Sequence, residues 1–240
     1  MDAKERRAEL RGAVNRADGV TVVRLAPAWL GSDEALQLLG DGLLAALVQQ
    51  VDGGVDLAAE CAGQLRERGW DGDENLAEHL EAALVGGPVK LLPLAVDLEE
   101  LAMILEGDEF GAGGRIDRHT GEVWSQAAIE YAEEMGDEDA ASAEGGDRWL
   151  WVDSEGSHDG YRDMHNFIAT VANPGDADRL EIAIQGRGAF RRFKDVLGRW
   201  PGELERWYAY SEERQRGRAR AWLADAGHHP ERRGGTAAGH

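Results

Sequence analysis

Apolar residues recur every three or four positions along most of the chain, which is the spacing of one face of an α-helix. Glycine and proline residues interrupt the pattern and divide it into segments. We therefore predict a predominantly helical protein. The expected helices span residues 3–17, 32–48, 55–68, 73–84, 97–107, 125–135, 158–172, 176–185, 188–199 and 201–226.

Three stretches have the β-branched or aromatic composition of strands instead. A short strand is predicted at residues 20–25, and a hairpin at about 114–124 has Gly121 at the left-handed position of its turn. A strand at about 148–153 would join the hairpin as its third strand. The predicted fold class is α+β, with this small antiparallel sheet packed against C-terminal helices.

A proline-containing apolar connector at residues 88–96 predicts a boundary between two domains. We expect a helical N-terminal unit at residues 1–94, an α+β domain at 95–227 and a disordered tail at 228–240. Residues 136–147 contain no large apolar side chain and predict a mobile acidic loop.

The charge of the chain is strongly negative but unevenly distributed. The formal net charge is −20, with 5 Lys/Arg against 23 Asp/Glu in residues 97–185 and 10 against 5 in residues 186–220. Such a field repels polyphosphate backbones, so the overall charge disfavours nucleic acid as a partner. There is no apolar run of the length that a membrane span needs and no secretory signal pattern. We therefore expect a cytoplasmic protein without a membrane partner, in which the single Cys61 lies in the core.

The basic segment is the strongest candidate for a binding site. Phe190 and Phe193 recur at helical spacing, with cationic residues between them. Arginines beside aromatic rings could bind a protein partner or a nucleic acid. Alternatively, the aromatic rings lie in the core and the guanidinium groups pair with acidic residues of the segment 97–185. The predicted binding residues are Arg187, Arg191, Arg192, Lys194, Trp207 and Tyr208.

No catalytic constellation or cofactor-binding motif is evident in the sequence. His158, Asp163 and His165 are metal-ligand types, but helical geometry places the histidines and Asp163 on different faces. Asp71, Asp73 and Asn75 match only the start of a calcium loop, and a helix N-cap is the simpler interpretation. We therefore predict no catalytic residue, no metal and no cofactor.

Several motifs of the C-terminal part resemble those of the bacterial uncharacterised protein family UPF0158. They include the segment Gly186-Arg187-Gly188-Ala189-Phe190-Arg191-Arg192-Phe193-Lys194-Asp195, the pair Trp207-Tyr208, and Ala221-Trp222-Leu223. The resemblance covers about residues 95–227 and implies a helical basic segment and a bacterial cytoplasmic setting, without implying an activity. The richness in Ala, Gly, Arg, Asp and Glu is typical of actinobacterial proteins, so we expect an actinobacterial member.

These observations favour a non-enzymatic binding or regulatory protein that mediates a protein–protein interaction. The first alternative is a nucleic-acid-binding accessory protein that uses Arg187, Arg191, Arg192, Lys194, Arg214, Arg216 and Arg218. The second is a metal-dependent enzyme with a site near His158, Asp163 and His165.

Overall fold

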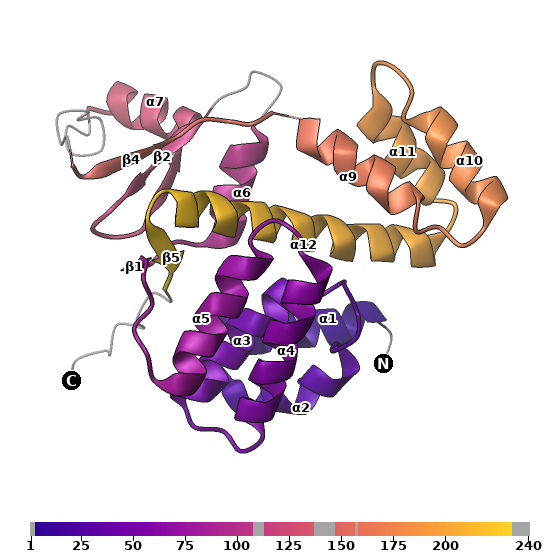
Figure 1. Cartoon of the computed structure of the whole chain (residues 1–240). Helices are drawn as coiled ribbons and strands as arrows, with labels where there is room; N and C mark the ends of the chain where they lie inside the picture. Colours follow the sequence, from indigo (N-terminus) through magenta and orange to yellow (C-terminus); the bar gives the residue numbers. More distant parts are fainter. Residues whose placement is uncertain (1–2, 108–112, 137–146, 157, 232–240) are drawn as a thin grey trace. The chain divides into compact units, whose positions relative to one another are not determined.

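The computed structural model describes residues 3–107, 113–136, 147–156 and 158–231 (Figure 1). The chain divides into two compact units. Unit 1 comprises Met1–Lys90 and Gly160–Ala221, and unit 2 comprises Leu91–Asp159 and Trp222–His240. Helices dominate the described residues and the strands are few and short, which confirms the predicted α+β class.

Unit 1 is built from helices. In chain order they are α1 (Ala3–Asn15), α2 (Gly19–Leu25), the short 3₁₀ helix η1 (Ala26–Ala28), α3 (Leu36–Val48), α4 (Gly54–Arg68), α5 (Asp73–Val85), α9 (His158–Ile168), α10 (Pro174–Ala183), α11 (Ala189–Leu197) and α12 (Pro201–Asp225). The helices α9 and α12 continue across the division between the units.

Two apolar clusters hold unit 1 together. The N-terminal cluster joins α1 to α5 and contains fully buried leucines together with Cys61, which is 0% exposed. Burial raises the pKa of the Cys61 thiol to about 12, so the prediction of a core cysteine is confirmed. The second cluster joins α9, α10, α11 and α12 around Phe167 and Phe193, both 0% exposed.

The strand predicted at residues 20–25 is wrong, because this segment forms α2. The Asp18 side chain accepts a hydrogen bond from the Thr21 backbone N–H at 3.0 Å and so caps the helix. Val22 and Leu25 are buried in the N-terminal cluster. Capping and burial on a helical face therefore outweigh the strand preference of the valines.

The predicted start of the helix 32–48 is also wrong, because α3 begins at Leu36. The helix begins after Ala35, which has no side-chain cap. Instead the carboxylate of Glu213 on α12 accepts hydrogen bonds from the backbone N–H groups of Gln37 (2.7 Å) and Leu38 (3.2 Å). A side chain remote in sequence therefore satisfies the first turn of α3.

Unit 2 contains a three-stranded antiparallel sheet with the order β3-β2-β4. Its described elements are β1 (Leu92–Leu94), α6 (Leu98–Glu106), β2 (Gly114–Asp117), β3 (Val123–Ser125), α7 (Gln126–Glu134), β4 (Trp149–Val152) and β5 (His228–Pro230). The hairpin and its third strand are thus confirmed, and Gly121 in the turn has φ +72°. Within the unit, α6 and α7 are the helices that contact this sheet.

The C-terminal segment contributes a strand to unit 2. The strand β5 pairs in parallel with β1, with Leu92 opposite His228 and Leu94 opposite Pro230. Residues 228–230 are therefore ordered, which corrects the predicted start of a disordered tail. Residues 232–240 and most of the predicted acidic loop, residues 137–146, lie outside the described residues.

The C-terminal helices belong to a different unit than predicted, because the sequence predicted two domains that follow one another along the chain. The division at residue 90 lies in the predicted connector, but residues 160–221 belong with the N-terminal helices. The physical reason is the ion pairs and hydrogen bonds that α12 makes with α3 and α4. None of the described helices combines the length and apolar content needed to cross a bilayer.

Candidate binding surface

The helix α11 has one buried face and one exposed face. It begins after Gly188, whose φ of +75° is in the left-handed region, and it buries Ala189, Phe193 and Leu197. The Phe193 ring meets the Trp207 ring edge to face with centroids 4.8 Å apart. Trp207 is 4% exposed, so this predicted binding residue lies in the core, as the alternative interpretation of the aromatic residues expected.

The opposite face of α11 exposes cationic side chains. Arg191 and Lys194 are exposed, as is Arg187 in the corner just before the helix, and the Arg191 side chain keeps 90% of its accessible surface. Among the residues that the structure describes, the ion-pair partner of Arg191 is the exposed Asp195, at 4.0 Å. Within the described part of the chain, neither the Arg187 nor the Lys194 side chain has an ion-pair partner. These three predicted residues therefore present charge to solvent.

Apolar side chains accompany these cations. Phe190 on α11 is 38% exposed, and a side chain at Gly160 on α9 would lie 3.0 Å from its ring. Ile182 on α10 is 68% exposed and Tyr161 on α9 is 39% exposed. Sequence analysis did not assign these three residues, because exposed and buried apolar positions look alike in the periodic pattern.

Arg192 has a structural role that its neighbours lack. Its guanidinium group donates hydrogen bonds to the backbone oxygens of Ala183 (3.0 Å), Gln185 (2.6 Å) and Gly186 (3.3 Å), and also to that of Arg187. These carbonyl groups end α10 and form the corner before α11. Arg192 therefore stabilises the corner that positions the exposed cations.

Tyr208, the remaining predicted binding residue, lies on α12 and is 48% exposed. It follows the buried Trp207 in sequence, but it is not a member of the apolar cluster that contains Trp207. An exposed tyrosine offers a flat apolar ring and a hydroxyl group to a partner. Its placement is compatible with binding, whereas that of Trp207 is not.

The arginines of α12 are bound inside unit 1. Asp163 on α9 is 1% exposed, and its two carboxylate oxygens accept hydrogen bonds from Arg214 Nε (3.0 Å) and Arg218 Nη1 (2.7 Å). Arg214 also pairs with Asp71 through Nη2 at 2.9 Å. The alternative that guanidinium groups pair with acidic residues of the segment 97–185 therefore holds for Arg214 and Arg218.

A second pair of arginines on α12 shares Asp41 of α3. Arg216 Nη2 and Arg220 Nη2 each lie 2.6 Å from a different oxygen of this carboxylate, and Arg220 Nε donates to Gln37 Oε1 at 2.8 Å. Burial acts to raise the pKa of Asp41, but the two guanidinium groups outweigh it and hold the pKa below its ordinary value. Asp41 therefore remains ionised.

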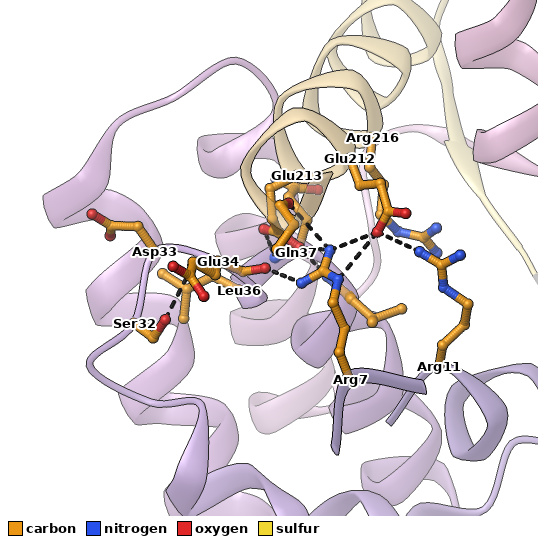
Figure 2. A network of polar contacts seen from close by, with 12 residues as sticks. Arg7, Arg11, Ser32, Asp33, Glu34, Leu36, Gln37, Glu212, Glu213 and Arg216 are labelled. Carbon is orange, nitrogen blue, oxygen red and sulfur yellow. Dashed lines mark hydrogen bonds and ion pairs between the residues drawn. The ribbon is translucent and has the colours of Figure 1, made fainter. Parts of the chain in front are cut away.

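Acidic residues of α12 complete the network. Figure 2 shows the side chains of Glu212 and Glu213 directed toward the guanidinium group of Arg7. Glu213 also accepts a hydrogen bond from Arg68 Nη1 at 3.2 Å, and Arg68 Nη2 lies 2.7 Å from Asp73. No local pattern predicts the pairs of Glu212 and Glu213 with Arg7 and Arg68, because their members lie far apart in the chain.

The candidate metal ligands do not form a site. Both oxygens of Asp163 bind arginines, while His165 Nδ1 lies 3.3 Å from Glu181 on the neighbouring α10. Asp71 and Asp73, from the partial calcium motif, bind Arg214 and Arg68. The N-cap of α5 is Gly72, so neither aspartate caps it. Across the described ranges, no three His, Cys, Asp or Glu side chains are grouped to hold a metal ion.

The comparisons with known proteins agree on one family. Residues 91–233 match the family model described as "Uncharacterised protein family (UPF0158)". The chain is similar to the "UPF0158 protein PA5073" of Pseudomonas aeruginosa, with 32% identity over 133 residues, which cover 55% of this chain and 84% of that protein. No solved structure matches. The matched region contains α11 and the arginines of α12, and the chain belongs to the UPF0158 family.

Proposed function

We propose that this chain is a binding protein without catalytic activity, which recognises an acidic segment of another protein through α11. The exposed face of α11 would make the contact through Arg191 and Lys194, together with Arg187 in the corner before the helix. Phe190 and Ile182 would supply apolar area beside them. Tyr208 is a further candidate contact on α12.

The main support for this proposal is that the basic residues of α12 are paired with carboxylates, whereas those at α11 are exposed to solvent. Arginines of α12 are bound to Asp163 and Asp41. Arg187 and Lys194 have no such partner in the described residues, although the chain carries 46 acidic side chains. Exposed cations beside exposed apolar side chains are typical of surfaces that bind other molecules.

A protein partner is favoured over nucleic acid, because several of the basic residues that would bind nucleic acid are already bound within the chain. Three of the seven basic residues in the nucleic-acid alternative, Arg214, Arg216 and Arg218, already bind carboxylates. Arg192 is engaged by backbone carbonyl groups. The cations that remain on α11 are few for a phosphate-binding surface on a chain with a net charge of −20.

Affinity capture from lysate of the native host, with and without nuclease, tests the proposal. The informative variant is Arg191→Glu/Lys194→Glu, because Arg192 is needed for the corner before α11. A protein that is captured by the wild type, survives nuclease and is lost with the variant would support the proposal. Capture of nucleic acid instead would contradict the proposal and support the alternative of a nucleic-acid-binding accessory protein.

The matched control is Lys4→Glu/Arg6→Glu on α1. These residues are also exposed in unit 1, and their reversal changes the net charge by the same amount. If the control loses the same partner as the α11 variant, total charge rather than α11 determines capture, and the proposal fails. Circular dichroism should confirm that both variants fold.

A bacterial cytoplasmic setting is part of the proposal. The relative from Pseudomonas aeruginosa supports the bacterial part. Since that organism is not an actinobacterium, the actinobacterial origin stays a prediction from composition. Fractionation of host cells with an antibody against the chain would test the cytoplasmic part, and recovery in the membrane fraction would contradict it.

A further inference from the structure

The helix α7 of unit 2 exposes an acidic face that contains an aromatic side chain. It buries Ile129 (4% exposed) and Ala132 (7% exposed), and the Ser125 hydroxyl caps its first turn. Glu130, Tyr131 and Glu134 occupy positions i, i+1 and i+4 on its exposed side, and Tyr131 is 65% exposed. Met135 after the helix is 68% exposed. An aromatic ring flanked by carboxylates is thus open to solvent.

The exposed face of α11 also contains an aromatic ring, but its neighbouring charges are positive. Phe190, Arg191 and Lys194 occupy positions i, i+1 and i+4 there, and all three are exposed. Residues one turn apart on a helix are neighbours on its surface. Both helices have nine residues, so each exposed face extends about 13 Å along its axis. The two faces are therefore similar in length, each contains an exposed aromatic ring, and they carry opposite charges.

We propose that α7 of one copy of this chain binds α11 of a second copy. Glu130 and Glu134 would pair with Arg191 and Lys194, while Tyr131 packs beside Phe190. This inference rests on the proposed function, since it names the acidic segment that α11 recognises. The two faces differ from each other, so each copy offers one face of each kind to a second copy.

We expect the contact between α7 and α11 to be weak, because the interface is small and both copies carry a negative net charge. Two short helices bury less surface than a standard stable interface, which is typical of transient association. The net charge of −20 on each copy adds repulsion. At about 0.15 M salt this repulsion is screened over a Debye length of about 8 Å, so the local pairs decide the outcome. Self-association is therefore expected at high protein concentration and moderate salt.

Reciprocal charge reversal tests the contact in the full chain. One variant is Glu130→Lys/Glu134→Lys, and the other is Arg191→Glu/Lys194→Glu. Each alone presents two faces of like charge, and association should weaken about tenfold or more, because every attractive pair becomes repulsive. An equimolar mixture presents opposite faces again and should recover association. Sedimentation velocity over a hundredfold range of concentration, at about 0.15 M salt, measures all three samples.

The controls separate the local contact from total charge. The α7 variant lowers the negative net charge, so simple repulsion predicts that it associates more than the wild type, whereas the proposed contact predicts less. Lys4→Glu/Arg6→Glu carries the same charge change as the α11 variant and should retain association. Circular dichroism of each variant confirms the helical content before the comparison.

Three results would overturn the inference: a wild type that stays monomeric throughout, an α7 variant that associates as well as the wild type, or a mixture that fails to recover. The proposed function would still stand if the α11 variant, but not the α1 control, lost a captured acidic protein. If capture were also unchanged by the α11 variant, both proposals would be wrong.

Discussion

The basic residues of α11 and of α12 are close in sequence and alike in type, but they have opposite environments. The Arg191 side chain is 90% exposed, whereas those of Arg214 and Arg218 are each 9% exposed. Four arginines of α12 form two pairs spaced by four residues, Arg214 with Arg218 and Arg216 with Arg220. Each pair lies on one side of the helix and shares one buried aspartate, Asp163 or Asp41.

The difference shows what determines whether the arginines of a basic segment are buried in ion pairs or remain exposed to solvent. Four-residue spacing directs two guanidinium groups of α12 to the same carboxylate, and that carboxylate comes from a different helix. A buried ion costs several kcal/mol of desolvation, which only close pairing and further hydrogen bonds offset. The α11 cations meet no buried carboxylate, so they remain in water. The buried pairs should therefore control folding, and the exposed cations should control binding.

Removal of Asp163 should produce the largest loss of stability. Asp163→Ala leaves Arg214 and Arg218 buried without their shared carboxylate, and breaking a buried pair in this way costs about 3–5 kcal/mol. Urea unfolding followed by far-ultraviolet circular dichroism measures the loss, because unit 1 supplies most of the described helix. The control is Asp195→Ala, which removes the exposed partner of Arg191 and should cost at most about 0.5 kcal/mol. If Asp163→Ala and Asp195→Ala lowered the unfolding free energy equally, the proposed difference between the buried pairs of α12 and the exposed pair of α11 would be wrong.

Neutralising Glu213 should have the next largest effect. Glu213→Gln keeps the shape of the side chain but removes the charge that binds Arg68 and one of the two oxygens that cap α3. A lost charge-assisted hydrogen bond in a buried site costs about 1–3 kcal/mol. Urea unfolding gives the total, and hydrogen exchange of the Gln37 and Leu38 amides should quicken selectively. Unchanged protection of these two amides would show that Glu213 does not cap α3.

The pairing of Asp41 with Arg216 and Arg220 should make stability depend on pH. The folded-state pKa of Asp41 lies below its ordinary value of 3.8. Its contribution is therefore complete above that value and is lost as the pH falls through the folded-state pKa. The difference in unfolding free energy between the wild type and Asp41→Asn should be largest near neutral pH and should shrink below about pH 4. A difference that stays constant between neutral and acid pH would contradict the proposed ionisation.

Local sequence patterns predicted most helices because their signals lie within each segment. The helices predicted at 97–107 and 125–135 form as α6 and α7, capped by Asp97 and Ser125, and Gly121 forms the hairpin turn as predicted. Failures occurred where a distant contact decides the structure. The β-branched residues of α2 suit a strand until they are buried beside α3, and the cap of α3 comes from Glu213, about 175 residues away.

The candidate site was only partly predictable for the same reason. A helical pattern identifies which residues share a face, so Phe193 could be separated from Arg191. It does not show whether an acidic residue faces an arginine in space. The partners of Arg214, Arg216, Arg218 and Arg220 lie on α3, α9 and the segment before α5. The sequence alone favoured internal pairing but did not identify these partners. Only the assembled unit distinguishes Arg191 from Arg214.

The smallest effect on stability is expected from the exposed cations themselves. Arg191→Ala/Lys194→Ala removes charges with at most a weak partner at 4.0 Å, so the unfolding free energy should change by less than about 0.5 kcal/mol. The same variant should lose the captured partner of the wild type. By contrast, Arg192→Ala should destabilise the corner after α10, because it leaves backbone carbonyl groups without a donor. A substantial loss of stability in the Arg191/Lys194 variant would mean that these cations support the fold, and loss of binding could then no longer be assigned to the surface of α11.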